Sequence, residues 1–414
     1  MTFAEWQSLS PAAAAREVHR RADSLLTPPQ RRAAIALLLP EAELAAAFEA
    51  ARGAGPLAGV PFLAKDLFDF KGTPTFAGST FLPEVRPAGG VDGAFARALR
   101  AAGAVFTGKT QLHEFAYGIT GENPHHGDCE VPGHPGRTTG GSSSGSAAAV
   151  AAGIVPFALA SDTGGSVRVP AAFCGLHGFR MTPGHPWIAD AFPLAPTFHT
   201  AGWFTRDAAD MRATLAALVP GDERRERAPR GLYLDLPDVD PDVAAACRTA
   251  ALAFAEPAPR ELAEALGVAF APALDAYHTI VACEAWEVHR TWAEANRARY
   301  DPLVWQRLQR HREITSQQLA TARRVLATMR ETWASYFREH DFLAMPGCPA
   351  PAPTKAGCTL EMRNRLIRIT APASLGGIPV LTSPVTLASG LSAGLQIIAP
   401  RAGSPVFPWV LGVK

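Results

Sequence analysis

Two loops of small residues, separated by only about 20 residues, constrain the fold of this chain more than any other feature of its sequence. The first loop is GGSSSGS at 140–146, and the second is DTGGSVR at 162–168. An Ala-rich helix near 146–152 and an apolar strand at 154–161 are predicted between them, and this connection can bring the loops close together in space. Small residues let main-chain N–H groups approach a ligand, and clustered N–H groups bind an anion. That anion can be a phosphate or the oxyanion of an acyl-transfer intermediate.

The elements predicted along the rest of the chain indicate an α/β protein. Helical patterns and short apolar strands alternate, and no flexible linker divides the sequence. The predictions are two or three helices in 1–52, a strand entering a loop at 55–72, a helix at 89–103, a surface loop at 220–231, helices through 275–340 and a β-hairpin at 377–400.

The composition is typical of a soluble globular protein. The 414 residues are 48% apolar and 19% charged, and the formal net charge is +1. Bulk charge therefore indicates neither nucleic acid nor an anionic membrane as a partner. Residues 1–21 lack the apolar core of a signal peptide, and the longest apolar stretch, 147–160, is too short to cross a bilayer. We expect a cytoplasmic protein.

Cysteine and histidine spacing favours neither disulfides nor a metal site. The six cysteines form no C-x-x-C pair, so we expect reduced, mostly structural thiols. His125 and His126 are adjacent, but no carboxylate or cysteine spacing beside them supports metal binding. We expect no metal and no other cofactor.

The stretch GAVFTGKT at 103–110 matches the P-loop pattern G-x-x-x-x-G-K-[ST]. A P-loop requires a strand, then the glycine loop, then a helix whose N-terminus faces the phosphates. Here a predicted helix precedes Gly103, and residues 104–106 are apolar and resemble a buried strand. Gly103 is then expected to end the helix, and Gly108 to end the strand. A nucleotide-binding protein remains only a remote alternative.

A serine beside an anion-binding loop is a candidate nucleophile, but it needs a base. No Ser-His-Asp arrangement can be recognised in the sequence, and the G-x-S-x-G motif is absent. Only five of the 39 basic residues are lysines, and one of them, Lys65, ends an apolar segment. Because burial lowers the pKa of a lysine, a buried Lys65 can be neutral near pH 7 and act as the base.

Together these motifs closely resemble the amidase signature family over about residues 55–400. The resemblance rests on GVPFLAKD (59–66), GAVFTGKTQLHEFAYG (103–118), GGSSSGSAAAVAAG (140–153), DTGGSVRVPAAFCGLHGF (162–179), DFLAMPGCPAPAP (341–353) and GLSAGLQIIAP (390–400). It implies one large domain with a central mixed β-sheet covered by helices on both faces. The implied organisation is a helical segment at 1–54 packed on a domain at 55–414, with core motifs at 59–184, a variable substrate-lining region at 185–340 and a return to the sheet at 341–400.

The resemblance also implies a catalytic triad of two serines and a lysine. Ser166 would be the nucleophile, Ser142 the bridging serine in a cis peptide, and Lys65 the base. The oxyanion would be held by the main-chain N–H groups of four consecutive residues, Thr163, Gly164, Gly165 and Ser166.

Structural roles are expected for other polar residues near the loops. Ser143 and Ser144 would shape the first loop, and Asp162 is expected to bond Arg168 across the second. Arg180 stands in GFRMT where many family members have lysine, so a lysine at that position has no chemical role there.

Candidate substrate contacts are less specific. They are Phe115, Tyr117, Ser143 and His126, the last within the loop at 122–128, together with Trp286 or Tyr300 from the helical region.

The resulting functional hypothesis is an amidohydrolase that cleaves an amide or urea-type C–N bond of a small molecule through an acyl-enzyme. The alternative is the glutaminase-like component of a tRNA-dependent amidotransferase, its A subunit, which works with partner chains. The chain is short for the family, and this favours the stand-alone hydrolase. A small-molecule amide is the expected partner, with a homodimer as a further possibility. The sequence identifies neither the amide nor the pocket residues within 185–340.

Overall fold

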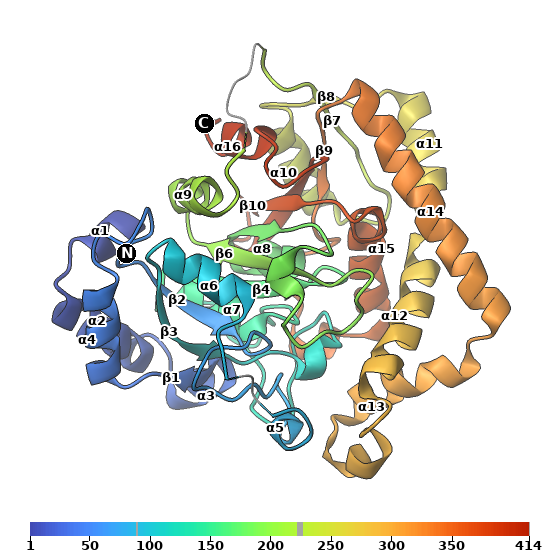
Figure 1. Cartoon of the computed structure of the whole chain (residues 1–414). Helices are drawn as coiled ribbons and strands as arrows, with labels where there is room; N and C mark the ends of the chain where they lie inside the picture. Colours follow the sequence, from blue (N-terminus) through green and yellow to red (C-terminus); the bar gives the residue numbers. More distant parts are fainter. Residues whose placement is uncertain (88–89, 222–226, 414) are drawn as a thin grey trace.

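A mixed β-sheet lies at the centre of the computed structural model, which describes residues 1–87, 90–221 and 227–413 (Figure 1). Within these residues the sheet has 11 strands in the order β1-β3-β2-β4-β6-β5-β10-β11-β9-β7-β8. Strand β2 runs parallel to β3 and β4, β7 runs parallel to β8 and β9, and the other neighbours are antiparallel. The strands are β1 Ile35–Leu38, β2 Pro61–Lys65, β3 Val105–Thr110, β4 Phe157–Asp162, β5 His177–Arg180, β6 Thr200–Thr205, β7 Gly231–Tyr233, β8 Glu256–Pro257, β9 Phe342–Pro346, β10 Val380–Thr386 and β11 Ser392–Ile398.

Helices cover both faces of this sheet, as predicted. Successive side chains of a strand point to opposite faces. Leu63 of β2 and Ala158 of β4 belong to the buried cluster that contains the alanines of α7. Phe62 and Phe157, one position earlier on the same strands, belong to the cluster that contains Phe95 of α6. The described helices are α1 Phe3–Gln7, α2 Pro11–Ser24, α3 Pro28–Ala34, α4 Glu41–Ala50, α5 Leu82–Val85, α6 Ala94–Ala101, α7 Ser144–Ala152, α8 Arg168–Cys174, α9 Ala208–Leu218, α10 Pro241–Ala251, α11 Arg260–Phe270, α12 Ala273–His289, α13 Pro302–Gln309, α14 Ser316–Glu339, α15 Leu360–Gly376 and α16 Val406–Val410.

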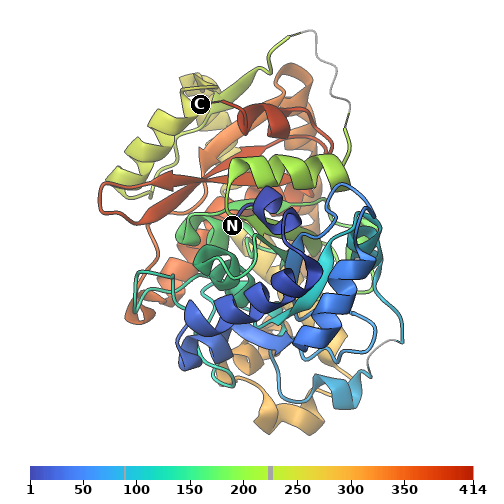
Figure 2. The ribbon, with the colours of Figure 1, turned by 90° about the vertical axis from the view of Figure 1, so that its left-hand side faces the viewer.

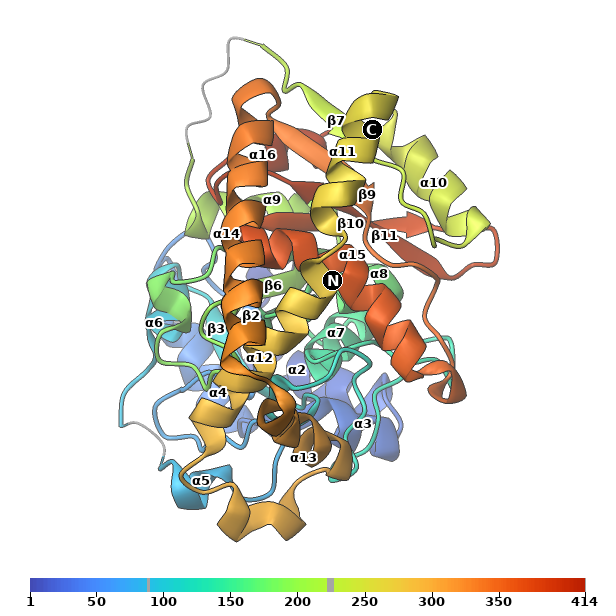
Figure 3. The ribbon, with the colours of Figure 1, turned by 90° about the vertical axis from the view of Figure 1, so that its right-hand side faces the viewer.

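A layer of three helices, α12, α14 and α15, covers one side of the molecule (Figure 3). These helices pack against one another, and the long helix α14 lies outermost. Helix α13 lies below them in the same view. The helices predicted through 275–340 are thereby confirmed, and so is the hairpin at 377–400, which is formed by β10 and β11.

The N-terminal segment differs from its prediction. It contains the four helices α1–α4 and also the edge strand β1, where two or three helices were expected; Figure 2 shows this segment on the side of the molecule that faces the viewer. Strand β1 pairs antiparallel with β3, so this segment contributes to the sheet. Four residues are too few for hydrophobic periodicity to distinguish a strand from a turn of helix. The charged run predicted at 220–231 lies partly outside the described residues.

The P-loop-like stretch is the body of strand β3. The strand continues through Gly108, Lys109 and Thr110, so the prediction that Gly108 ends it is wrong. Gly108 has φ +151°, and a Cβ there would lie 2.1 Å from the main-chain oxygen of Leu37 in β1. Glycine is needed for this close approach of two strands. Residues 108–110 pair with both neighbouring strands of the sheet, and they form no loop that wraps a phosphate.

One stretch, Arg260–His289, is long and apolar enough to cross a membrane by length and composition alone. It is separate from residues 147–160, the apolar stretch that was considered from the sequence. It consists of two helices, α11 and α12, separated at Pro272. Helix α12 packs against α14 and α15, and its buried residues, among them Tyr277 and Ile280, belong to the core of the folded chain.

Candidate active site

Lys65 is the last residue of β2, and its side chain is fully buried. Its Nζ atom donates hydrogen bonds to three serine hydroxyls, at 2.7 Å to Ser142, 2.9 Å to Ser143 and 2.9 Å to Ser161. Burial lowers the pKa of Lys65 well below its ordinary value, and the negative charge of Asp162 opposes this shift without cancelling it. A neutral amine that contacts a serine hydroxyl can accept its proton, so this contact is suited to general-base chemistry.

The loop before α7 holds Ser142 in place. The peptide bond between Gly141 and Ser142 is cis, as the family resemblance implies. The main chain is bonded on both sides of it, since the N–H of Gly141 donates to the oxygen of Ile119 at 2.9 Å. The N–H of His113 donates to the oxygen of Ser142 at 3.0 Å. These bonds fix the Ser142 hydroxyl against the amine of Lys65.

The second loop is organised around the buried carboxylate of Asp162. It accepts hydrogen bonds from the main-chain N–H groups of Gly165 at 2.9 Å and Val167 at 3.0 Å. The guanidinium groups of Arg168 and Arg180, both fully buried, bind the same carboxylate at 2.9 and 2.8 Å. Burial alone would raise the pKa of Asp162, but the two arginine charges hold it well below its usual range. The predicted bond between Asp162 and Arg168 is confirmed, and Arg180 joins it.

Three main-chain N–H groups of this loop are available to a ligand. Those of Thr163, Gly164 and Ser166 donate to no other described residue, and all three residues border the cavity described below. Gly165, the fourth predicted oxyanion donor, differs because its N–H already donates to Asp162.

Helices α12 and α15 approach this loop too closely for any residue but glycine. A Cβ on Gly164 would lie 2.2 Å from the hydroxyl of Tyr277 on α12. Gly165 has φ +133°, and a Cβ there would lie 3.0 Å from Oγ1 of Thr370 on α15. Thr370 also donates from its hydroxyl to the oxygen of Gly164. The glycines therefore allow two distant helices to brace the loop.

A cavity of about 250 Å³ adjoins Ser166. Its walls come from residues 116–119, from the second loop and from helices α12, α13 and α15. Ser166 is almost buried, with 6% of its surface exposed, and it is one of the lining residues. A serine hydroxyl, free N–H groups and a small cavity thus meet at one place, as acyl transfer requires.

Of the predicted substrate contacts, Tyr117 lines the cavity and Phe115 does not. Phe115 has φ +51° and is fully buried, with its ring 5.3 Å from that of Tyr300 between centroids. Both rings lie in an aromatic cluster of the core. The sequence does not reveal which of two nearby aromatic side chains faces a cavity, because the backbone conformation determines the direction of each side chain.

The remaining predicted contacts lie elsewhere. His126 has Nε2 3.4 Å from the main-chain oxygen of Ser79, and it does not line the cavity. The ring of Trp286 stacks on that of His311, with centroids 4.1 Å apart, also outside the cavity wall. Ser143 contacts the buried lysine rather than the cavity, which agrees with its expected role in shaping the loop.

Several residues of the site have no signal of their own in the sequence. Ser161 immediately precedes the second loop, and only its position at the end of β4 places it beside Lys65. Tyr277, Arg307 and Thr370 come from helices more than 100 residues further along the chain. Only tertiary packing brings them to the loops, so sequence spacing could not find them.

Lys109 forms a buried ion pair with Asp66, with Nζ and Oδ1 3.0 Å apart. It also donates to the main-chain oxygen of Pro74 at 2.7 Å and to Oγ1 of Thr75 at 2.9 Å. Burial raises the pKa of Asp66, and the charge of Lys109 opposes this. Because Asp66 follows Lys65 directly, Lys109 orders the chain next to the site.

The six cysteines are all free, as expected from their spacing. Among the described residues, no group of three or more His, Cys, Asp or Glu side chains is arranged to hold a metal ion. His125 is paired with the carboxylate of Glu114 at 2.9 Å.

Comparisons with known proteins agree with this geometry. The chain is 32% identical over 427 aligned residues to the A subunit of the glutamyl-tRNA(Gln) amidotransferase of Chloroflexus aurantiacus, covering 87% of this chain and 84% of the relative. It is 44% identical to Amidase 1 of rice, but over 165 residues that cover 40% of this chain and 38% of the relative. A solved amidase structure superposes with a TM-score of 0.81 and 30% identity over 100% of this chain and 98% of the other.

The family model for amidases matches residues 27–404. This span contains the buried lysine, both small-residue loops and the helices that line the cavity. The chain therefore belongs to the amidase family.

Proposed function

We propose that this protein is an amidohydrolase that cleaves a C–N amide or urea-type bond of a small molecule through an acyl-enzyme on Ser166. One observation carries the proposal: the buried amine of Lys65 touches the Ser142 hydroxyl, and the neighbouring loop presents Ser166 to a small cavity. Membership of the amidase family supports it.

Acylation begins with proton transfer along the two serines. Ser166 gives its hydroxyl proton to Ser142, which gives its own to the neutral amine of Lys65. The Ser166 oxygen bonds to the amide carbonyl carbon, and the carbonyl oxygen becomes an oxyanion. Free N–H groups of the second loop stabilise this charge. Among the described residues no hydrogen bond joins the two hydroxyls, so Ser166 Oγ must turn toward Ser142 when substrate binds.

Collapse of the oxyanion breaks the C–N bond. The proton held by Lys65 returns through Ser142 to the leaving nitrogen, which departs as ammonia or an amine. A water molecule then gives a proton to the same relay and attacks the acyl carbon. The carboxylic acid leaves, and Ser166 recovers its proton. Lys65 acts as base and then acid in each half of the cycle, so its pKa must lie near the working pH.

Ser166 is tested with a fluorophosphonate probe on the purified chain. We expect covalent labelling of Ser166, and loss of both labelling and amide turnover in Ser166→Ala. Ser335→Ala, on the exposed side of α14, is the matched control and should behave like the parent. Labelling that persists in Ser166→Ala would assign the nucleophile to another residue.

The second candidate function is the glutaminase-like component of an amidotransferase. It is favoured by the similarity to the Chloroflexus protein over most of both chains. The same relay would then release ammonia for a partner chain. Copurification from the native source distinguishes the two functions, since only the amidotransferase component should bring stoichiometric partners with it. A cytoplasmic location and a homodimer stay predictions.

A further inference from the structure

Three arginines border the cavity: Arg307, at the end of α13, Arg310, which directly follows that helix, and Arg363 on α15. Arg363 is neutralised, because its Nη2 lies 2.8 Å from the carboxylate of Glu122. Neither Arg307 nor Arg310 forms an ion pair with a described residue. No described aspartate or glutamate lines the cavity. The cavity wall therefore carries two arginines without an ion-pair partner among the described residues, although the charges of Glu122 and Asp301 act on Arg307 from further away.

Hydrogen bonds hold the guanidinium group of Arg307 in place, but not all of its donors have a partner. Its Nη1 donates to the main-chain oxygen of Tyr117 and, at 3.1 Å, to Nε2 of His113. Burial and the nearby arginine charges lower the pKa of His113 well below its usual value, so this neutral ring accepts the bond. The Nη2 atom of Arg307 is buried without a hydrogen-bond partner among the described residues. Arg307 as a whole is half-buried, and a buried donor atom that lacks an acceptor carries a desolvation cost.

Arg310 lies three residues after Arg307 and on the same side of the helix, as the i, i+3 spacing requires. It is half-buried, and its main-chain N–H donates to the oxygen of Arg307, but its side chain forms no hydrogen bond with a described residue. His278 also lines the cavity, and burial and the charge of Arg310 lower its pKa to about 4. His278 is therefore neutral near pH 7 and does not change the charge of the cavity.

The same cavity contains Ser166 and the free N–H groups of Thr163 and Gly164. An amide that reaches Ser166 therefore enters a small cavity whose wall includes two arginines that form no ion pair with a described residue. A guanidinium presents its N–H groups in a planar fork that matches a carboxylate. An ammonium group, in contrast, would meet like charge and no described acid in the wall.

We propose that the substrate of the amidohydrolase is a small amide that also carries a carboxylate, and that Arg307 and Arg310 bind this carboxylate. The inference rests on the proposed function and specifies its substrate class. It excludes cationic amides, such as amino-acid amides with a free ammonium group, as good substrates.

The test compares substrates that are matched in shape and differ in charge. The purified chain is assayed with malonamate, succinamate and glutaramate, each beside a neutral methyl-ketone analogue and a cationic amino-amide of the same length. We expect kcat/KM of the best carboxylate to exceed that of its neutral analogue about 10- to 100-fold, the worth of a charge-assisted hydrogen bond. The cationic amide should be the poorest of its set.

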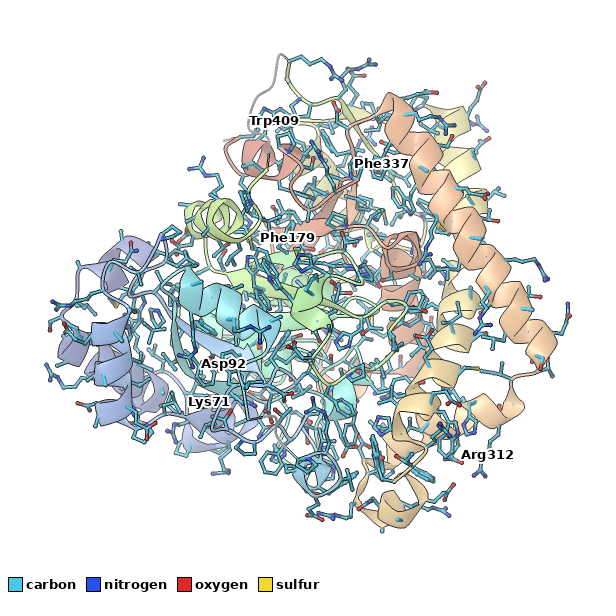
Figure 4. The ribbon with its side chains drawn as sticks, in the orientation of Figure 1. Lys71, Asp92, Phe179, Arg312, Phe337 and Trp409 are labelled. Carbon is cyan, nitrogen blue, oxygen red and sulfur yellow. The ribbon has the colours of Figure 1, made fainter. Side chains whose placement is uncertain are left out.

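Variants assign the preference to the arginines. Arg310→Gln should reduce the ratio of carboxylate to neutral kcat/KM toward one, Arg310→Lys should restore part of it, and Arg310→Glu should favour the cationic amide. Arg312→Gln is the matched control, because Arg312 is two residues away, pairs with Glu294 at 2.8 Å and lies at the outer surface (Figure 4). Its ratio should equal that of the parent.

Binding is measured separately by calorimetry of the three carboxylates on Ser166→Ala, with and without Arg310→Gln. Hydrolysis of neutral amides without any carboxylate preference would overturn this inference and leave the amidohydrolase intact. If the parent bound a carboxylate in an Arg310-dependent way but hydrolysed none of the amides, the carboxylate site would be supported and the amidohydrolase function would be overturned. A carboxylate preference that Arg307→Gln and Arg310→Gln both leave unchanged would also overturn the inference.

Discussion

At the scale of single residues, Lys65 derives its chemistry from its surroundings. Its amine is fully buried and touches three neutral hydroxyls, while the carboxylate that acts on its pKa, Asp162, is already bound by two arginines. Desolvation disfavours the charged amine, and the opposing field of Asp162 does not cancel this effect. The result is a lysine whose amine loses its proton at a pH well below the ordinary lysine pKa of 10.5.

The pH dependence of kcat/KM should show this shift. Activity requires the unprotonated amine, so the rate should rise with pH and reach its plateau well below 10.5, the ordinary pKa of a lysine. The check is a pH profile with a neutral amide, on protein whose fold is verified by circular dichroism at each pH. A rising limb centred at or above 10.5 would show that Lys65 is not the base.

Replacing the lysine should remove the relay without removing the nucleophile. Lys65→Ala should lower kcat about 10²- to 10⁴-fold, the usual contribution of a general base. Lys65→Arg should lower it nearly as much, because a guanidinium stays protonated. Lys71→Arg, at an exposed position labelled in Figure 4, is the control and should keep full activity. A Lys65→Arg variant with near-normal kcat would be incompatible with a proton relay through this side chain.

At the scale of elements, the buried carboxylate of Asp162 and its two arginines connect α8, α15 and β5 to the second loop. Arg168 begins α8 and also donates to the main-chain oxygen of Thr370 and the hydroxyl of Ser374 on α15. Arg180 of β5 donates to both the carboxylate and the main-chain oxygen of Asp162. These charge-assisted bonds hold the second loop in one conformation between a strand and two helices.

Breaking this network should destabilise the fold. Arg168→Met leaves buried acceptors unpaired, and we expect a loss of about 3–5 kcal/mol in the free energy of unfolding. Because the pKa of Asp162 is depressed, its stabilising contribution is complete above the unfolded-state pKa of about 4 and is lost as the pH falls toward the folded-state pKa. Urea unfolding at pH 7 and pH 3 checks both statements. A pH-independent stability in this range would remove Asp162 as a major contributor.

The close contact between the second loop and α12 gives a further prediction. In Gly164→Ala the new Cβ must displace the hydroxyl of Tyr277, 2.2 Å away, or shift the free N–H groups of the loop. We expect kcat to fall about 10²-fold or more, comparable to the loss of one oxyanion donor. Gly267→Ala, on α11 with no atom within 4 Å of the new Cβ, is the control and should be neutral or stabilising. Equal activity of the two variants would mean that this part of the loop does not act on the transition state.

At the scale of the whole molecule, the site forms where two parallel strands end. Lys65 ends β2 and Asp162 ends β4, so parallel pairing brings the base and the second loop to the same edge of the sheet. This is the edge where ligands bind in open α/β sheets. Helices α12, α13 and α15 then close the cavity, although they are encoded far from the loops.

The proposed catalytic groups all lie on one chain, and this arrangement predicts activity without a partner. The purified protein should hydrolyse a carboxylate-bearing amide at the same specific rate across a range of protein concentrations. Sedimentation analysis of the same samples shows whether the active species is the predicted homodimer. Turnover that appears only after addition of another protein from the native source would favour the amidotransferase alternative.

Short sequence patterns were sufficient to predict much of the candidate site. The two small-residue loops and the scarcity of lysine predicted a serine nucleophile beside an anion-binding loop and Lys65 as its base, because conformational freedom and proton chemistry are properties of single residue types. The resemblance to the amidase signature family then implied Ser142 and Ser166 in particular. Local pattern failed at β1, where four residues are too short for periodicity, and at Gly108, where the strand continues. It also misplaced Phe115, whose positive φ accompanies a ring buried in the core.

The sequence by itself determined the fold class, the family and the residues that can carry the chemistry. Only the tertiary structure decided which groups meet. The N–H of Gly165 donates a hydrogen bond to Asp162, and Arg307 and Arg310 line the same cavity as Ser166 without an ion-pair partner among the described residues. Residue types and short spacings reflect local energetics, whereas burial and charge compensation depend on the packing of elements that lie more than 100 residues apart. The proposed reaction thus follows from local sequence motifs and the family that they resemble, and the proposed substrate class follows from long-range packing.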